Sequence, residues 1–407
     1  MKLVKLNSKN MEQLYERNLY YRRKSTIEKV QRMIEDVRMN GDAAVLKYTR
    51  RFDKVKLQAK DLRVSECEIS SAFQNISPDF IDTLKFIINN VSAFYKKQIK
   101  RPVSIKSADG IMLKEEYKSL DTVGFYIPAG TAPLVSSVYM TVIPARIAGV
   151  RRIVIVTPPG KDGRVNPYIL AVANLLNVDE VYKVGGAQAV AALAFGTKSI
   201  PRVDKIVGPG NAYVTEAKRQ LFGYVDIDML AGPTELVVIA NRLSNPDYVV
   251  ADFESQIEHA GGLSILISTS KQLIRQVKNR VQGGIVIYAK NIQEACEIAN
   301  RIAPEHLQIL TNNPKSIAKL IKNAGAIFLG PYSPTPLGDY IAGPSHVLPT
   351  LGTAKFSSGL CLNDFLKTSH IISYSRKALE KVREPLEKVA LIEGLVKHAE
   401  SVNVRFK

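Results

Sequence analysis

The spacing of apolar residues predicts two amphipathic helices in the first hundred residues. The first begins at Ser25-Thr26, repeats apolar side chains every three or four residues, and ends at Asn40-Gly41, a typical stop signal. The second begins at Ser77-Pro78-Asp79, where serine is a favoured N-cap and proline a favoured first residue. Its apolar stripe comprises Ile81, Leu84, Ile88, Val91 and Tyr95. Residues 1–24 have no core of their own, so we expect an arm that docks elsewhere.

From Thr122 onward, short β-type runs alternate with helical patterns. Strands are predicted at residues 123–127, 153–156, 181–184 and 205–207. Helices are predicted near residues 167–176 and 187–195. This alternation is typical of a parallel, doubly wound sheet, in which ligands bind beyond the carboxyl ends of the strands. The turns that hold Tyr126, Gln188 and Asn211 are therefore candidate binding loops.

A second β/α series follows the first. Its predicted strands are residues 236–240, 264–268, 285–288, 307–310 and 326–329. Its predicted helices are residues 245–260, 292–302 and 314–322. Residues 330–364 are rich in glycine, proline, serine and threonine, and such a long irregular segment is usually functional or disordered. Residues 379–400 have the amphipathic pattern of a tail helix.

The predicted fold is α/β, with two Rossmann-like, incomplete, doubly wound parallel-sheet domains, a small N-terminal arm and a C-terminal helical tail. We expect the arm at residues 1–24 and a main domain formed by residues 25–120 and 234–364. A second α/β domain is expected at residues 121–233, and the tail at residues 365–407. With 407 residues, the chain is long enough for two or more cores.

Composition and charge describe an ordinary globular protein. The net charge is +18, but the basic residues are scattered, so they predict a solvated surface that attracts anionic ligands and no nucleic-acid partner. The three cysteines, Cys67, Cys296 and Cys361, are far apart and form no disulfide framework, which favours a reducing, cytoplasmic setting. No signal peptide and no membrane-spanning run is expected.

Gln256 and His259 are the starting point for candidate metal chemistry. They lie three residues apart near the end of one predicted helix and would share a face. An amide oxygen and an imidazole can bind a borderline divalent cation, and Asp339 and His398 would add ligands without thiolates. Simpler interpretations stay open: a hydrogen-bonded pair for Gln256 and His259, a turn cap for Asp339 and a solvent-facing His398.

Glu305 and His306 are adjacent at the start of a predicted strand. Near a metal they would form an acid/base pair, although a strand directs neighbouring side chains to opposite faces unless it is irregular. A surface salt bridge is the alternative.

No GxGxxG or P-loop pattern occurs in the sequence. However, Gly185-Gly186 and Gly208-Pro209-Gly210 each follow a strand and open a helix, which suits either a bound anion or a plain tight turn. These residues indicate an α/β metal-dependent enzyme, either a hydrolase or an oxidoreductase.

Eight motifs are similar to those of histidinol dehydrogenases. In chain order they are Phe125–Gly130 (FYIPAG), Val184–Val190 (VGGAQAV), Val207–Lys218 (VGPGNAYVTEAK), Asp228–Glu235 (DMLAGPTE), Ser255–His259 (SQIEH), Ala303–His306 (APEH), Gly338-Asp339, and Ser345–Pro349 (SHVLP). The resemblance runs from about residue 25 to the C-terminus. It implies a zinc enzyme that oxidises L-histidinol to L-histidine through histidinaldehyde with two NAD+, as the last step of histidine biosynthesis.

The resemblance also implies roles for individual residues. One Zn2+ per subunit would be held by Gln256, His259, Asp339 and His398, with the substrate imidazole and amine completing the sphere, so that these four ligands also contact the substrate. Glu305 would activate water at the aldehyde stage, and His306, also in contact with substrate, would be the general base of hydride transfer.

Further contacts follow from the same resemblance. Thr234, His346 and Glu393 fall on substrate-binding positions. Tyr126, Gln188 and Asn211 fall on positions that bind NAD, in agreement with the binding-loop interpretation. The family forms intertwined homodimers, so the active site would be shared between subunits and completed by the neighbour's tail.

Two positions depart from the family pattern, and two other functions stay open. Thr234 stands where serine is common, and Ala129 replaces a common glycine; the segment around residues 281–284 is shorter than is typical. A relative that oxidises another small alcohol, such as a sulfonated diol (sulfopropanediol), is one alternative, which His346, Glu393 and His398 disfavour. A metal-dependent hydrolase, such as an aminopeptidase, is the other, and it predicts activity without NAD+.

Overall fold

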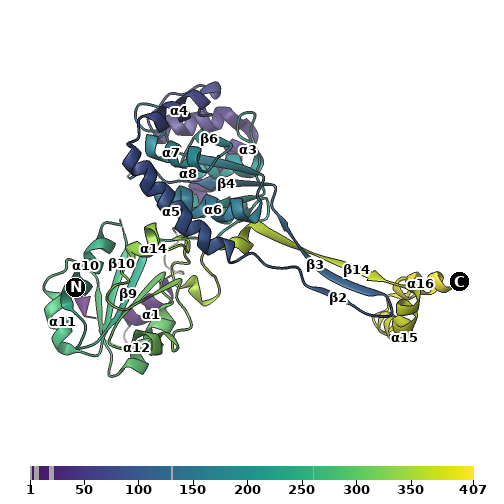
Figure 1. The fold of residues 1–407 in the computed structure, drawn as a ribbon. Coiled ribbons are helices and arrows are strands. Elements are labelled where there is room, and N and C mark those ends of the chain that lie inside the picture. The colour runs from purple at the N-terminus through teal and green to yellow at the C-terminus, as the bar shows by residue number, and fades with distance from the viewer. Residues whose placement is uncertain (1, 4–8, 18–22, 130–131, 260) are drawn as a thin grey trace. The chain divides into compact units, whose positions relative to one another are not determined.

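Figure 1 shows the fold in a computed structural model of the chain, which describes residues 2–3, 9–17, 23–129, 132–259 and 261–407. The described residues divide into two units. The first unit comprises Met1–Gln98 and Leu120–Phe365, and the second comprises Ile99–Ser119 and Leu366–Lys407. The first contains two parallel sheets, and the second contains an antiparallel sheet and helices.

One sheet of the first unit has the strand order β6-β5-β4-β7-β8, and each neighbouring pair is parallel. Its strands are β4 (Thr122–Tyr126), β5 (Arg152–Thr157), β6 (Glu180–Lys183), β7 (Lys205–Val207) and β8 (Asp226–Ile227). The intervening helices are α6 (Val135–Ala148), α7 (Pro167–Leu175), α8 (Gly186–Phe195) and α9 (Ala212–Leu221). The strand order reverses at β4. The topological switch point therefore lies between the carboxyl ends of β4 and β7.

Helices α3 (Lys24–Phe52), α4 (Glu66–Gln74) and α5 (Pro78–Lys96) lie between the N-terminal arm and this sheet along the chain. Ser77 caps α5 as predicted, and α3 breaks at the predicted stop, Gly41. Gly41 has a φ of 51°, outside the helical region, so α3 consists of two helical segments joined by a kink, of which only the first was predicted. The helix resumes because Ala44, Val45 and Tyr48 continue its apolar stripe into a core that includes the alanines of α8.

The other sheet of the first unit has the order β1-β11-β10-β9-β12-β13. Its strands are β1 (Lys2–Leu3), β9 (Glu235–Ala240), β10 (Leu263–Ser268), β11 (Ile285–Tyr288), β12 (His306–Leu310) and β13 (Ala326–Leu329). The connecting helices are α10 (Pro246–Ile257), α11 (Lys271–Lys278), α12 (Ile292–Ile302) and α13 (Pro314–Ala318). All its neighbouring strands are parallel, and its order reverses at β9, as at β4 in the first sheet.

The described part of the N-terminal arm docks on this second sheet of the same chain. Strand β1 pairs with β11, and helix α1 (Lys9–Tyr15) places Met11 and Leu14 in the core beneath α12. Residues 4–8 and 18–22 of the predicted arm lie outside the described residues. The apolar side chains of α1 need this sheet because seven residues cannot form a core alone.

The second unit differs most from the prediction. Strands β2 (Ser104–Lys106), β3 (Ile111–Ser119) and β14 (Leu366–Tyr374) form an antiparallel sheet that the sequence pattern did not predict. The single tail helix predicted at residues 379–400 is wrong. The chain forms α15 (Arg376–Ile392) and α16 (Val396–Asn403), separated at Gly394, whose φ of 72° leaves the helical region.

Two other predicted helices are shorter than expected. The helix predicted at residues 245–260 ends at Ile257, and the helix predicted at residues 314–322 ends at Ala318. The irregular segment of residues 330–364 contains a short helix, α14 (Pro336–Tyr340), and two 3-10 turns. The predicted α/β class with two Rossmann-like sheets is confirmed, whereas the domain boundaries remain predictions. In the described part of the chain, no helix has the length and hydropathy of a membrane span.

A buried ion pair fixes the turn that follows β7. Lys218 on α9 pairs with Asp228 after β8, and both side chains are almost fully buried. The Lys218 ammonium donates to the carbonyl of Gly208 (3.0 Å), while the Gly208 N–H donates to Asp228 (2.7 Å). Gly208 has a φ of 122°, and a Cβ there would lie 2.2 Å from the carbonyl oxygen of Tyr126. The pair therefore holds the chain where the loops after β4 and β7 meet.

Removing one partner should leave an uncompensated buried charge. We expect Lys218→Met to lower the free energy of unfolding by about 3–5 kcal/mol, measured by urea denaturation. Lys85→Met is the matched control, because Lys85 pairs with Asp82 on the exposed face of α5, and it should change stability by less than about 1 kcal/mol. Equal effects of the two substitutions would contradict this role of the buried pair.

Candidate active site

The residues predicted to carry the chemistry gather at the amino ends of β9 and β12. Glu235 and His306 are the first residues of these adjacent strands, and His306 is in register with Leu236. Thr234 and Glu305 directly precede them. In the first sheet, by contrast, the candidate binding loops lie at the carboxyl ends of the strands. The two sheets therefore present opposite edges to their candidate sites.

Glu305 is buried and held by two donors. Its Oε2 accepts hydrogen bonds from the Thr234 hydroxyl (2.6 Å) and from the Glu235 N–H (2.8 Å). Burial raises the pKa of Glu305 to about 8, although both hydrogen bonds oppose this shift. Near neutral pH, this carboxyl group can therefore both accept and return a proton.

His306 is held as a neutral base. Its Nδ1 lies 3.2 Å from the carbonyl oxygen of Glu235, which can only accept, so Nδ1 carries the proton and Nε2 has the free lone pair. Burial lowers the pKa of His306 and keeps the ring uncharged. Its Nδ1 is also 3.6 Å from Glu305 Oε2, and its Nε2 is 3.6 Å from Asp339 Oδ1.

The pairing of Glu305 with His306 depends on irregular backbone before β12. Ala303 adopts a left-handed conformation with a φ of 49°, and Pro304 follows it. Regular pairing starts only at His306. The side chains of Glu305 and His306 can therefore approach each other, which a regular strand would prevent.

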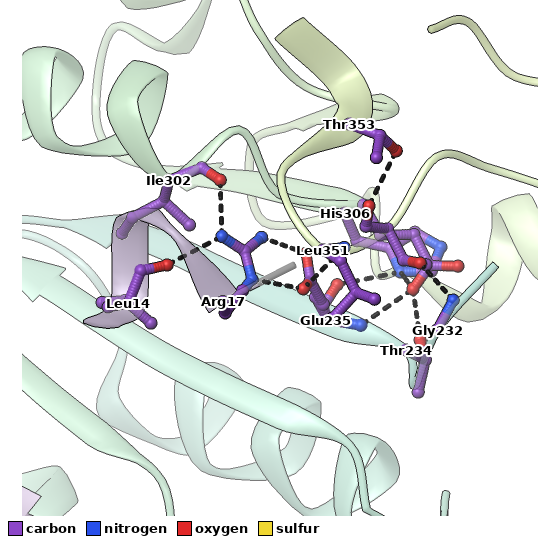
Figure 2. A network of polar contacts seen from close by, with 11 residues as sticks. Leu14, Arg17, Gly232, Thr234, Glu235, Ile302, His306, Leu351 and Thr353 are labelled. Carbon is purple, nitrogen blue, oxygen red and sulfur yellow. Dashed lines mark hydrogen bonds and ion pairs between the residues drawn. The ribbon is translucent and has the colours of Figure 1, made fainter. Parts of the chain in front are cut away.

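Figure 2 shows the network around Glu235, which joins these groups to distant parts of the chain. The Glu235 carboxylate, which is 2% exposed, forms a bidentate ion pair with Arg17 (2.5 and 2.6 Å). It also accepts from the Leu351 N–H (3.0 Å), and Arg17 donates to the carbonyl oxygens of Leu14 and Ile302. The side chain of Glu235 thus ties down the strand whose main chain orients Glu305 and His306.

The segment of residues 330–364 is held beside the site by α5 and α6. The Tyr95 hydroxyl on α5 accepts from the Ser345 N–H (2.9 Å) and donates to the Leu360 carbonyl (3.2 Å). On α6, the Tyr139 hydroxyl donates to the carbonyl of Tyr340 (3.0 Å). This irregular segment is therefore ordered by tyrosine hydrogen bonds.

His346 lies within this ordered segment and faces two polar groups. Its Nδ1 donates to the Asp339 carbonyl (2.9 Å), which leaves Nε2 to accept from the Ser137 hydroxyl (3.3 Å). Burial lowers the pKa of His346 to about 4, so the ring is neutral at working pH. A cavity of about 470 Å³ adjoins His346 and His306 and is also lined by Phe328, Gly338 and Leu348.

Three of the four predicted metal ligands belong to the first unit. His259 does not share a helix face with Gln256, because α10 ends at Ile257; a turn joins them, with the His259 N–H donating to the Gln256 carbonyl (3.3 Å). The predicted end at Ala260 lies outside the described residues. Gln256 is buried and its amide Nε2 has no hydrogen-bond partner among the described groups. Burial raises the pKa of Asp339, and the nearby charges of His306 and His259 oppose this rise.

This donor set fits a borderline divalent cation. Gln256, His259 and Asp339 offer one amide, one imidazole and one carboxylate, with no thiolate. Across the described residues, no three histidine, cysteine or acidic side chains form a ready metal cage. His398 and Glu393 belong to the second unit, where both are exposed, and their part in the site remains a prediction.

The predicted cofactor residues lie at the carboxyl edge of the first sheet. The hydroxyl of Tyr126, the last residue of β4, accepts from the Gly186 N–H at the start of α8 (3.1 Å). Gln188, in the first turn of α8, is 1% exposed, and neither end of its amide has a described partner. Asn211 caps α9 through its Oδ1, so its amide nitrogen remains to donate. Unpaired polar groups at a helix N-terminus suit an anionic ligand with hydrogen-bonding groups. Gly130 of the loop after β4 lies outside the described residues.

Sequence reasoning missed several residues that hold the site. Glu235, Arg17 and Tyr95 make their bonds to partners far along the chain, and such pairings leave no local pattern. One signal was present for Glu235, since it is an acid at the start of the apolar run Leu236–Ala240. A buried strand rarely begins with an acid unless the carboxylate has a partner.

The Thr234 hydroxyl should tune Glu305. Thr234→Val keeps the shape but removes a donor to the ionised carboxylate, so the pKa of Glu305 should rise further above 8, by about one to two pH units. Carbon-13 NMR of glutamate-labelled protein would follow the titration. Thr234→Ser retains the hydroxyl and should leave the pKa unchanged. An unchanged pKa in the valine variant would show that the hydroxyl does not stabilise the carboxylate.

Comparison with known proteins shows the family. A sequence profile described as histidinol dehydrogenase matches residues 18–406. The histidinol dehydrogenase of Clostridium acetobutylicum is 48% identical over 400 residues, which cover 94% of this chain and 92% of that protein. The histidinol dehydrogenase of Listeria monocytogenes serotype 4b is 47% identical over 397 residues, with 93% and 92% covered.

A solved structure agrees with these sequence matches. The crystal structure of histidinol dehydrogenase from Elizabethkingia anophelis matches with a TM-score of 0.93 at 35% identity and covers 100% of this chain and 98% of that chain. The chain therefore belongs to the histidinol dehydrogenase family, and it is an oxidoreductase.

Proposed function

We propose that the enzyme oxidises L-histidinol to L-histidine through histidinaldehyde, with zinc and two NAD+, as the last step of histidine biosynthesis. The observation that carries this proposal is the neutral His306 base beside a Glu305 carboxyl whose pKa is about 8. Oxidation of an alcohol to an acid requires two different proton transfers, and these two groups suit them.

Gln256, His259, Asp339 and His398 would hold one zinc ion per subunit. The unpaired amide of buried Gln256 and the absence of thiolates in this set support such a site. When bound, zinc would supply a fixed anchor for the amine and imidazole of the substrate. Thr234, His346 and Glu393 would contact the substrate, together with the metal ligands and His306.

His306 would act in the alcohol step. Its free Nε2 takes the hydroxyl proton as the carbon-bound hydrogen leaves with its electron pair, and the Glu235 carbonyl stabilises the resulting imidazolium through Nδ1–H. NAD+, held by Tyr126, Gln188 and Asn211, would supply the hydride acceptor. The alcohol carbon becomes an aldehyde, and one NADH forms.

Glu305 would act in the aldehyde step. Its carboxylate removes a proton from water as the water oxygen adds to the aldehyde carbon, which gives a hydrate. After His306 has released its first proton to solvent, its Nε2 would take a hydroxyl proton of the hydrate as the second hydride leaves for the second NAD+, which yields the carboxylic acid. The hydrogen bonds from the Thr234 hydroxyl and the Glu235 N–H hold the Glu305 carboxylate in place while it takes the proton from water.

The active site would be shared between the subunits of a homodimer, with the tail of the neighbouring copy supplying Glu393 and His398. Exposed apolar side chains on the tail helices, including Val389, Ile392 and Val396, support burial against another copy. Three free cysteines support a reducing, cytoplasmic location. The protein would need neither nucleic acid nor membrane as a partner.

The reaction should produce two NADH for each histidine formed. We expect absorbance at the NADH band when L-histidinol and NAD+ are mixed with the enzyme, with loss of activity after chelation and recovery on addition of zinc. Amino-acid analysis of the same samples gives the ratio. A ratio of one, or no NADH at all, would refute the four-electron assignment.

Glu305→Gln should separate the two steps. An amide cannot remove the proton from water, so we expect the oxidation of histidinaldehyde to slow by about 100-fold or more, while the first turnover of L-histidinol changes far less. Rapid-mixing measurements of NADH formation from each substrate would show this. If both oxidations fall by the same factor, Glu305 does not serve the water step in particular.

A further inference from the structure

Asp53 is a half-buried aspartate, and one of its two carboxylate oxygens is buried without a partner among the described groups. It caps the C-terminus of α3, and its Oδ2 is buried with no hydrogen bond from any described group. The other two aspartates of α3 are satisfied, since Asp36 binds Lys47 and Asp42 binds Ser199. Burial raises the pKa of Asp53 to about 6, and the C-terminal end of a helix further disfavours a negative charge. An acid kept in such a costly position is a candidate for ligand binding.

The packing of α3 against α8 places Asp53 at the ligand edge of the first sheet. Asp42 on α3 binds Ser199, which lies just beyond the C-terminal end of α8. Eleven residues of helix from Asp42 to Asp53 span about 16 Å, close to the length of the ten-residue α8. The two helices pack side by side, so Asp53 reaches the level of the N-terminus of α8. Its charge accordingly acts on the Tyr126 hydroxyl, which accepts from Gly186.

Other unsatisfied polar groups occupy the same edge. The amide of Gln188 lacks partners at both ends, and the hydroxyl of Thr157, the last residue of β5, is buried without one. Val55, two residues after Asp53, lies within 3.4 Å of the Cβ position of Gly163, in the loop that follows β5. These groups lie at the same carboxyl edge as Tyr126, on whose hydroxyl the charge of Asp53 acts.

We propose that Asp53 accepts hydrogen bonds from the ribose hydroxyls of the adenosine half of NAD+ and thereby selects NAD+ over NADP+. This assignment rests on the proposed NAD-dependent function. In dinucleotide folds, an acid at the end of the second strand usually binds this ribose. Here the second strand ends in Thr157-Pro158-Pro159, and no acid stands there. Asp53 brings a carboxylate to that edge from a different element, and a 2′-phosphate beside it would be repelled.

The test measures cofactor binding directly, with NAD+ and NADP+ as probes on the full-length enzyme without L-histidinol. We expect Asp53→Asn to weaken the Kd of NAD+ by about tenfold or more in calorimetric titrations, because a charged acceptor is lost. Binding of NADP+ should be unchanged or tighter, so the preference for NAD+ falls by at least about tenfold. The KM for L-histidinol should stay within about twofold.

Controls separate binding from folding and from overall charge. Asp162→Asn removes an acid from the loop after β5 and should leave both dissociation constants within about twofold. The melting temperature of Asp53→Asn should equal or exceed that of the unchanged enzyme at pH 8, because a buried unpaired charge is removed. Asp53→Ala should repeat the loss of NAD+ affinity.

Two results would overturn the assignment. One is NAD+ binding within about twofold of the unchanged enzyme in both Asp53 variants. The other is an equal loss of affinity for NAD+ and NADP+, which would mean that the carboxylate does not bind the ribose hydroxyls. Failure of the proposed function looks different: the unchanged enzyme would bind NAD+ and form no NADH from L-histidinol, and the comparison of dissociation constants would still decide the role of Asp53.

Discussion

The ion pair between Arg17 and Glu235 is the interaction on which the candidate site depends. Glu235 is the first residue of β9, and its side chain is fixed by Arg17 and by the Leu351 N–H. Its main chain, in turn, donates to Glu305 and accepts from His306. One residue therefore connects the N-terminal arm, the irregular segment and the two groups proposed for proton transfer. This carboxylate is almost fully buried, so loss of Arg17 would leave its charge without a counter-charge. The protein would become less stable, and the main chain of Glu235 would no longer be held in the position that orients Glu305 and His306.

Apart from the added edge strand β1, the two sheets have the same strand order, but their candidate sites lie at opposite ends of the strands. In the first, the loops after β4, β6 and β7 meet at the topological switch point, as expected for nucleotide binding. In the second, the amino ends of β9 and β12 hold the acid/base pair, and the turn after α10 and helix α14 bring the candidate metal ligands. This second arrangement departs from the general rule for open α/β sheets. It requires an irregular approach to β12, which the left-handed Ala303 provides.

Most of the parallel strands could be predicted from sequence because they read as continuous apolar runs, but the two-residue strands β1 and β8 were too short to give such a pattern. Strands β3 and β14 could not, since mixed charged and apolar residues such as Ile111–Ser119 give no clear period. The break of α3 at Gly41 was predicted from the local stop signal, whereas the helical segment that follows it was not, because that segment depends on the packing of α3 on α8. Motifs identified Glu305, His306 and Asp339. These groups act on one another and on Thr234 and His259, which the motifs also identified, whereas the part played by Glu235 was not predicted.

The most direct test of the location of the site is anomalous X-ray diffraction at the zinc edge, on crystals grown with zinc and L-histidinol. The account predicts one zinc peak per subunit at the amino edge of the second sheet, at about 2.0–2.2 Å from a nitrogen of His259 and an oxygen of Asp339. The bound substrate should present its reacting carbon to His306 and Glu305. A zinc peak at the carboxyl edge of either sheet, or one without contact to these ligands, would contradict the account.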